Sequence, residues 1–160
     1  MPSWWIDEPL VRGTGNPTTD QLRDWYAEGF RTVISFLDEA YQSPGYDVAT
    51  VQSMGYERYN IPIADFEPPT LSQFFEFRAI MARVLARGKV VLHCQAGLGR
   101  TGTLAAAHWI DKGLSAAQAI QRVRAANPLA IESREQSDSL YTYELATAHT
   151  GREDKSPKAQ

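Results

Sequence analysis

The only cysteine of the chain, Cys94, lies in the segment HCQAGLGRT (residues 93–101), which directly follows the apolar run VVL. A cysteine followed by five residues and an arginine, with two glycines between them, allows successive backbone N–H groups to converge on one point. Such a concavity binds oxyanions, and the planar fork of Arg100 suits phosphate oxygens. The segment therefore predicts an anion-binding loop with Cys94 as its nucleophile.

A packing role for Cys94 is the alternative, because a free cysteine often fills a small apolar space where a strand turns into a helix. A strand-to-helix turn that only packs a cysteine needs neither two glycines nor an arginine. The pattern therefore favours a nucleophilic role for Cys94 over a packing role. A thiol is mostly protonated at neutral pH, so the loop must favour the thiolate through its amides, a helix start and the guanidinium. The predicted phosphate-binding residues are Gln95, Ala96, Gly97, Leu98, Gly99 and Arg100.

Two residues at the ends of the segment are further candidates. Thr101 can donate its hydroxyl to the Cys94 sulfur, or serve only as a cap at the helix start. His93 ends the preceding strand, and we expect it to orient the loop by hydrogen bonds to the backbone rather than exchange protons with a substrate. The chain contains no His/Cys cluster, so neither a metal site nor a metal cofactor is expected.

The surrounding pattern predicts the elements that must position this loop. Apolar positions at helical spacing alternate with short apolar runs, which is typical of an α/β domain with a central, mostly parallel sheet flanked by helices. The expected strands are 32–37, 56–61 and 90–93, and the expected helices are 19–28, 48–54, 71–88, 101–112, 116–126 and 133–148.

Length and charge limit the other possibilities. The 160 residues suit a single domain over 1–150, followed by a polar tail over 151–160 that we expect to be flexible. A net charge of −3 argues against nucleic-acid binding. One cysteine excludes an internal disulfide, and no signal peptide or membrane span is recognisable. We expect a cytoplasmic monomer that does not bind membranes.

The pattern HCx5RT after a strand resembles the phosphate-binding signature of the cysteine-dependent protein tyrosine phosphatases. The segment IADFEPP (63–69) is similar to the general-acid loop of the small, atypical dual-specificity phosphatases and their archaeal and bacterial relatives. The segment AIESREQ (130–136) is similar to the loop and helix start that follow the signature in those relatives. The resemblance covers roughly residues 10–146 and implies the phosphatase fold.

The resemblance implies phosphomonoester hydrolysis through a cysteinyl phosphate, without a cofactor. It assigns Asp65 as general acid, and Gln136 with Glu132 as residues that place the hydrolytic water. From the sequence alone, Asp65 can be a turn residue, Glu67 is a competing acid, and Gln136 can belong to a helix capping box with Ser133. The implied substrate is a phosphoprotein or phosphopeptide, with phosphotyrosine favoured, and phosphate, vanadate or tungstate should bind the loop.

Other functions remain open. A rhodanese-like sulfurtransferase also places one cysteine on an anion-binding loop, but Asp65 would then have no task. A lipid phosphatase favours lysines in the loop, whereas Gln95, Ala96 and Leu98 are uncharged. A non-catalytic phosphopeptide-binding module would not need the nucleophile. Asp38 and Glu39, on the loop after a predicted strand, could touch the substrate or Arg100, but we expect them in a solvated loop.

Overall fold

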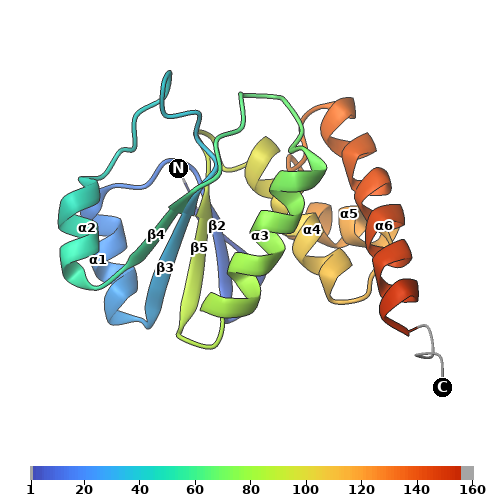
Figure 1. Ribbon diagram of the computed structural model, residues 1–160. Helices are drawn as coiled ribbons and strands as arrows, with labels where there is room; N and C mark the ends of the chain where they lie inside the picture. The colour runs from blue at the N-terminus through green and yellow to red at the C-terminus, as the bar shows by residue number, and fades with distance from the viewer. Residues whose placement is uncertain (1, 156–160) are drawn as a thin grey trace.

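A five-stranded sheet with helices on both faces forms the centre of the computed structural model (Figure 1). The structure describes residues 2–155, with the backbone alone from 149 onward. The order across the sheet is β1-β2-β5-β3-β4. The strands are β1 (Trp4–Asp7), β2 (Val11–Thr14), β3 (Phe30–Ser35), β4 (Glu57–Asn60) and β5 (Lys89–His93).

Four of these strands run parallel, and the edge strand β1 is antiparallel to β2. Parallel strands end at the same edge of the sheet, so the segments that follow β2, β3, β4 and β5 meet there. β5 lies in the middle, between β2 and β3. The segment after β5 therefore lies where loops from both sides can reach it.

The helices divide between the two faces of the sheet (Figure 1). α1 (Thr19–Ala27) and α2 (Val48–Met54) cover one face, where Leu22 and Val51 pack with Val33 and Val91. The other face carries α3 (Leu71–Val84), α4 (Gly99–Asp111), α5 (Ala116–Ala126) and α6 (Arg134–Lys155). Capping boxes at Thr18, Thr70 and Ser115 satisfy the first amides of α1, α3 and α5.

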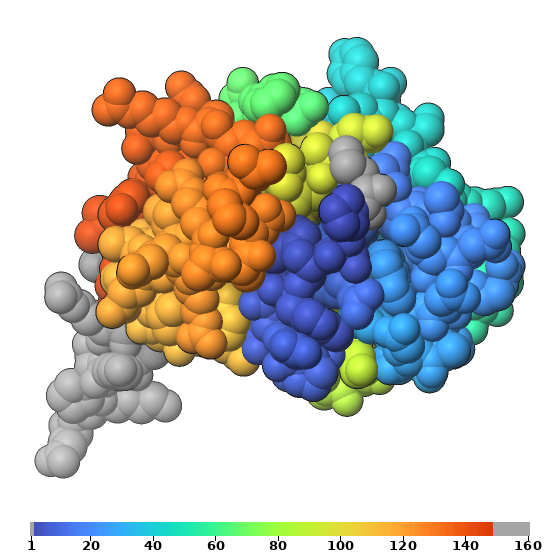
Figure 2. Space-filling view, turned by 180° about the vertical axis from the view of Figure 1, so that it is seen from behind, coloured from blue at the N-terminus to red at the C-terminus, as the bar shows by residue number. Residues whose placement is uncertain are grey.

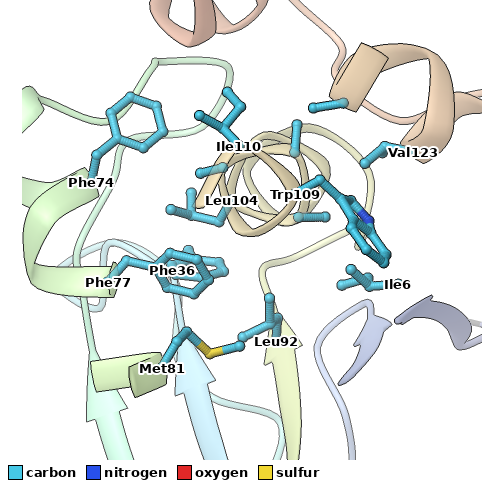
Figure 3. Packing of buried hydrophobic residues seen from close by; sticks show 14 of the residues in the cluster. Ile6, Phe36, Phe74, Phe77, Met81, Leu92, Leu104, Trp109, Ile110 and Val123 are labelled. Carbon is cyan, nitrogen blue, oxygen red and sulfur yellow. The ribbon is translucent and has the colours of Figure 1, made fainter. Parts of the chain in front are cut away.

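Helix α4 runs through the larger core, where Leu104 and Ile110 pack among Phe77, Leu92 and other apolar side chains (Figure 3). Every residue from Gly99 to Ile110 is buried. Burying one large aliphatic side chain contributes roughly 1.5–3 kcal/mol, so the packing fixes this helix firmly. Its first turn, which carries Arg100, is fixed with it.

The predicted α/β domain with a mostly parallel sheet is confirmed. β1 and β2 were not predicted, because each is only four residues long and β2 contains Arg12 and Gly13. Helix α4 begins at Gly99 rather than 101, and α6 extends to Lys155 rather than 148. The rest of the predicted tail, 156–160, lies outside the described residues. No helix in the described part is long and apolar enough to cross a membrane.

Candidate active site

The segment between β5 and α4 turns its backbone carbonyls toward the surrounding protein. The Gln95 carbonyl accepts a hydrogen bond from the backbone amide of Asn16 at 2.9 Å. The Gly97 carbonyl accepts one from the Trp4 indole at 3.1 Å. The Leu98 carbonyl accepts one from the Ile131 amide at 3.0 Å. These contacts fix the peptide planes of the loop from outside.

The amides of the same peptide units face the other way. In a trans peptide the C=O of one residue and the N–H of the next point in opposite directions. The N–H groups of Ala96, Leu98 and Gly99 therefore face the inside of the loop, and the Gly97 N–H donates to Cys94 Sγ at 3.3 Å. The sulfur lies at the base of a ring of amide donors, which is a site for an oxyanion.

Gly97 is the residue that permits this curvature. Its φ of +78° lies in the left-handed region. A Cβ at this position would lie 2.4 Å from the Gly15 amide nitrogen and 2.5 Å from the Thr14 carbonyl carbon. No other residue fits, so the loop can lie directly against the end of β2.

Arg100, in the first turn of α4, adds a buried positive charge at the end of the loop. Its side chain is 1% exposed, and Nη1 donates to the Ile63 carbonyl at 2.8 Å and to the Phe36 carbonyl at 3.4 Å. Nη2 lies 3.4 Å from Asp65 Oδ1, close enough for an ion pair but without hydrogen-bond geometry. Among the described residues, Nε and Nη2 have no hydrogen-bond partner. A buried guanidinium with unpaired N–H groups fits a phosphate ligand.

The loop after β4 holds Asp65 over this site. The carbonyls of Phe66 and Glu67 accept hydrogen bonds from Ser133 Oγ at 2.8 Å and Gln136 Nε2 at 3.4 Å, while Ile63 binds Arg100. The Asp65 side chain is 45% exposed, so it faces both solvent and the guanidinium. This position suits a proton donor to a bound leaving group. Of the two candidate acids, Asp65 has the ion pair with Arg100.

His93 takes part in a directional chain of hydrogen bonds below the loop. Its Nδ1 lies 3.3 Å from the Cys94 carbonyl, which can only accept, so Nδ1 carries the proton. Nε2 then accepts from the Tyr46 hydroxyl at 2.8 Å, and Tyr46 accepts from Arg58 Nε at 2.9 Å. Burial, with a smaller contribution from the Arg58 and Arg100 charges, lowers the pKa of His93 to about 3. The ring is neutral and orients the loop through the backbone.

Tyr46 and Arg58 were not predicted from the sequence, and Glu39 is paired with Arg58 rather than freely solvated as expected. Arg58 Nη2 donates to Glu39 Oε1, and the Glu39 side chain is 30% exposed. A carboxylate paired with the half-buried Arg58 is not a freely solvated loop residue. Neither tyrosine nor arginine at these positions carries a local sequence signal, since the partners come together only in the folded sheet.

The remaining candidates lie close to the loop in different ways. Thr101 Oγ1 is buried and has no hydrogen-bond partner among the described residues, so it forms neither a bond to the sulfur nor a capping bond at the start of α4. Gln136 Oε1 accepts from the amides of Glu132 and Ser133, as in the expected capping box. A Cβ on Gly99 would nevertheless lie 2.7 Å from Glu132 Oε1 and 3.0 Å from Gln136 Nε2. Both side chains therefore also border the loop.

No metal-binding cluster accompanies these groups: within the part of the chain that the structure describes, no three His, Cys, Asp or Glu side chains are grouped to hold an ion. The site brings together a thiol, convergent amides, a buried guanidinium and a carboxylic acid. That set can bind a phosphoryl group, attack it and protonate a leaving oxygen.

Comparisons with known proteins agree with this chemistry. Residues 10–114 match the family described as "Polymorphic toxin system, DSP-PTPase phosphatase". Protein tyrosine phosphatase domain-containing protein 1 of Danio rerio is 38% identical over 79 residues, which are 49% of this chain and 11% of that protein. Dual specificity protein phosphatase CDC14C of Homo sapiens is 34% identical over 84 residues, covering 52% of this chain and 18% of that protein. The chain thus spans only a small part of these curated relatives.

Solved structures match over more of their length. The crystal structure of Tk-PTP in the active form is 32% identical with a TM-score of 0.78, and the match covers 89% of this chain and 96% of that one. PTPMT1, solved in complex with PI(5)P, is 20% identical with a TM-score of 0.82, covering 93% of this chain and 98% of that one. At that identity PTPMT1 shows the fold alone.

Proposed function

Because the chain belongs to the DSP-PTPase family of protein tyrosine phosphatases, we propose that it hydrolyses phosphomonoesters in two steps through a phosphate bound covalently to Cys94. One observation carries the proposal. The Gly97 amide donates to the Cys94 sulfur, and the buried Arg100 that closes the same loop has Nε and Nη2 without a hydrogen-bond partner among the described residues and Asp65 3.4 Å from Nη2. A sulfurtransferase would not require Asp65 beside that arginine, and a binding module would not require the thiol.

In the first step, the Cys94 sulfur forms a bond to phosphorus while the bond from phosphorus to the ester oxygen breaks. Asp65 gives its proton to the departing oxygen, which avoids expelling an alkoxide or phenolate. The loop amides and Arg100 bind the three non-bridging oxygens and stabilise the charge that develops on them. Arg100 is held in place by two backbone carbonyls, so it needs little reorganisation.

In the second step, water attacks the phosphocysteine. The Asp65 carboxylate accepts the proton from the water, the sulfur–phosphorus bond breaks, and inorganic phosphate and the Cys94 thiolate are released. Gln136, and with it Glu132, borders the loop at Gly99 and is suited to place this water. The Thr101 hydroxyl, which is buried without a partner among the described residues, is available to the thiolate as it departs.

The proposed substrate is a phosphorylated protein or peptide, with phosphotyrosine preferred and phosphoserine or phosphothreonine accepted. The uncharged loop side chains of Gln95, Ala96 and Leu98 support this choice over a polyphosphorylated lipid headgroup. The names of the relatives, protein tyrosine and dual-specificity phosphatases, support it as well. We also propose that the protein acts in the cytoplasm as a monomer, and that phosphate, vanadate and tungstate occupy the loop.

The test is hydrolysis of an aryl phosphate by the purified protein and its variants. Cys94→Ser and Arg100→Ala should abolish turnover. Asp65→Asn should lower kcat by about 10² to 10⁴ while retaining tungstate binding. Arg87→Ala, at an exposed ion pair with Glu57, is the matched control for the arginine and should leave activity unchanged. Turnover by the Cys94→Ser protein would refute the nucleophile.

Further assays separate the alternatives. Glu67→Gln should retain most activity, whereas a loss as large as that of Asp65→Asn would move the general acid to Glu67. A phosphotyrosine peptide, a phosphoserine peptide and vesicles containing PI(5)P, assayed in parallel, decide the substrate class. Transfer of sulfur from thiosulfate to cyanide would instead support the sulfurtransferase.

A further inference from the structure

The indole of Trp4 reaches the catalytic loop from the edge of the sheet. In β1, Trp4 pairs with Gly13 of β2, and its Nε1 donates to the Gly97 carbonyl at 3.1 Å. A Cβ on Gly13 would lie 2.9 Å from Trp4 Cε2 and 3.0 Å from Nε1. The absence of a side chain at Gly13 therefore lets the indole lie across β2. Figure 2 shows the N-terminal residues, in dark blue, beside the yellow segment that follows β5.

The carbonyl that Trp4 holds differs from its neighbours in the loop. Backbone amides of Asn16 and Ile131 hold the Gln95 and Leu98 carbonyls, and these donors are fixed by the main chain. The Gly97 carbonyl instead accepts from a side chain on a four-residue strand at the edge of the sheet. The outward orientation of the Gly97 carbonyl therefore depends on the position of the Trp4 indole.

The orientation of the peptide unit between Gly97 and Leu98 is set by ψ of Gly97 and φ of Leu98. Glycine leaves ψ of Gly97 free, whereas Leu98, at a φ of −114°, would have to move toward the left-handed region, so both Leu98 and the Trp4 hydrogen bond favour the outward carbonyl. Rotation of this unit would turn the carbonyl oxygen into the loop and the Leu98 N–H out of it. One donor for an oxyanion would then be replaced by a partial negative charge close to it, which disfavours both a bound phosphate and the transition state.

We propose that Trp4 is a positioning residue that holds the Gly97–Leu98 peptide in the orientation that binds oxyanions. The inference rests on the proposed function, because it assigns the loop to a phosphoryl group. It gives Trp4 alone, among the residues of the edge strand β1, an indirect role in the active site through the Gly97 carbonyl. Trp5, the next residue, stacks on Phe30 with ring centroids 6.1 Å apart and has no hydrogen bond to the loop.

The test compares Trp4→Phe with the matched control Trp5→Phe. Trp4→Phe removes the indole N–H and keeps an aromatic ring. We expect its affinity for tungstate to fall at least about fivefold, the effect of losing one hydrogen bond, with a lower kcat and a higher KM for an aryl phosphate. Trp5→Phe should retain the tungstate affinity, kcat and KM of the unaltered protein. Circular dichroism should show the same secondary structure in both variants.

Two further measurements keep the inference open to refutation if Trp4→Phe does not fold. Gly13→Ala keeps the indole but displaces it, and it should weaken tungstate binding in the same way. In the unaltered protein labelled with ¹⁵N at its tryptophans, tungstate should shift one indole N–H resonance. The inference is overturned if the folded variants bind tungstate as tightly as the unaltered protein, or if tungstate shifts no indole resonance.

These outcomes are separate from a failure of the proposed function. Tungstate binding requires the loop but no turnover, so each protein can be compared without an activity assay. An unaltered protein that binds no tungstate and hydrolyses no ester would overturn the proposed function and this inference together. An unaltered protein that does both, with Trp4→Phe indistinguishable from it, would overturn only the role of Trp4.

Discussion

Acid should destabilise this protein through His93, and replacing that residue by asparagine should remove the effect. The ring is fully buried, and its pKa of about 3 in the folded chain lies below the ordinary value of 6.5. As the pH falls below 6.5, the unfolded chain takes up a proton that folded His93 does not. The stabilisation from the neutral ring is therefore complete above pH 6.5 and is lost as the pH falls toward 3.

The size of this loss of stability follows from the pH range between the unfolded and the folded pKa of His93. Each pH unit between 6.5 and the folded pKa costs about 1.4 kcal/mol, so the loss on going to pH 4.5 is about 3 kcal/mol. Burial raises the pKa of Asp111 to about 6, which acts in the opposite direction over the same range. Asp111 is unchanged in His93→Asn, so its contribution cancels when the two proteins are compared.

The assay is urea unfolding followed by circular dichroism at about pH 7.5 and 4.5. The free energy of unfolding of the unaltered protein should fall by about 3 kcal/mol more than that of His93→Asn. In parallel, ¹⁵N spectra should show the Nδ1–H form of the ring throughout the range from about pH 5 to 8. Equal losses in the two proteins, or a ring that titrates near pH 6.5, would refute the neutral His93 and the chain of hydrogen bonds built on it.

Three other substitutions have defined outcomes. Asp111→Asn should steepen the loss of stability as the pH falls from about 6 to 4, because a carboxyl with a raised pKa stabilises the fold when protonated and so offsets the His93 contribution over this range; urea titrations that keep the original slope would contradict it. Gly97→Ala should weaken tungstate binding and lower kcat at least about 10²-fold, since its Cβ would lie 2.4 Å from the Gly15 amide, and calorimetry showing normal binding would be incompatible with the loop described. Gln136→Ala should slow hydrolysis of the phosphocysteine roughly 10²-fold, and stopped-flow traces should then show a burst of leaving group; a steady state without a burst would exclude its role in placing water.

The phosphate-binding loop could be predicted from sequence because its chemistry is contiguous. Cys94 and Arg100 lie six positions apart, and the glycines that permit the curvature lie between them. Asp65 could be assigned only through the family resemblance, since a lone aspartate before a Pro-Pro pair is also a turn residue.

The supporting contacts could not be predicted in this way. Trp4 and Tyr46 meet the loop across 93 and 47 residues, respectively, and neither residue type is specific for such a contact. β2 contains Arg12 and Gly13, which interrupt its apolar pattern, and β1 is a short edge strand that, in the described part of the chain, pairs only with β2. For Thr101 the sequence suggested a contact that the structure lacks. Its position in the segment suggested a bond to the Cys94 sulfur, but its hydroxyl has no hydrogen-bond partner among the described residues.

The central claim is that phosphate passes through a covalent bond to Cys94, and trapping that bond tests it most directly. Asp65→Asn mixed with an aryl phosphate and quenched in acid should carry phosphate on Cys94, identified by peptide mass spectrometry and by the ³¹P signal of a phosphorus–sulfur bond. The same protein with Cys94→Ser should carry none on that peptide. Ester turnover by the unaltered protein with no phosphocysteine in the quenched Asp65→Asn sample would contradict the account.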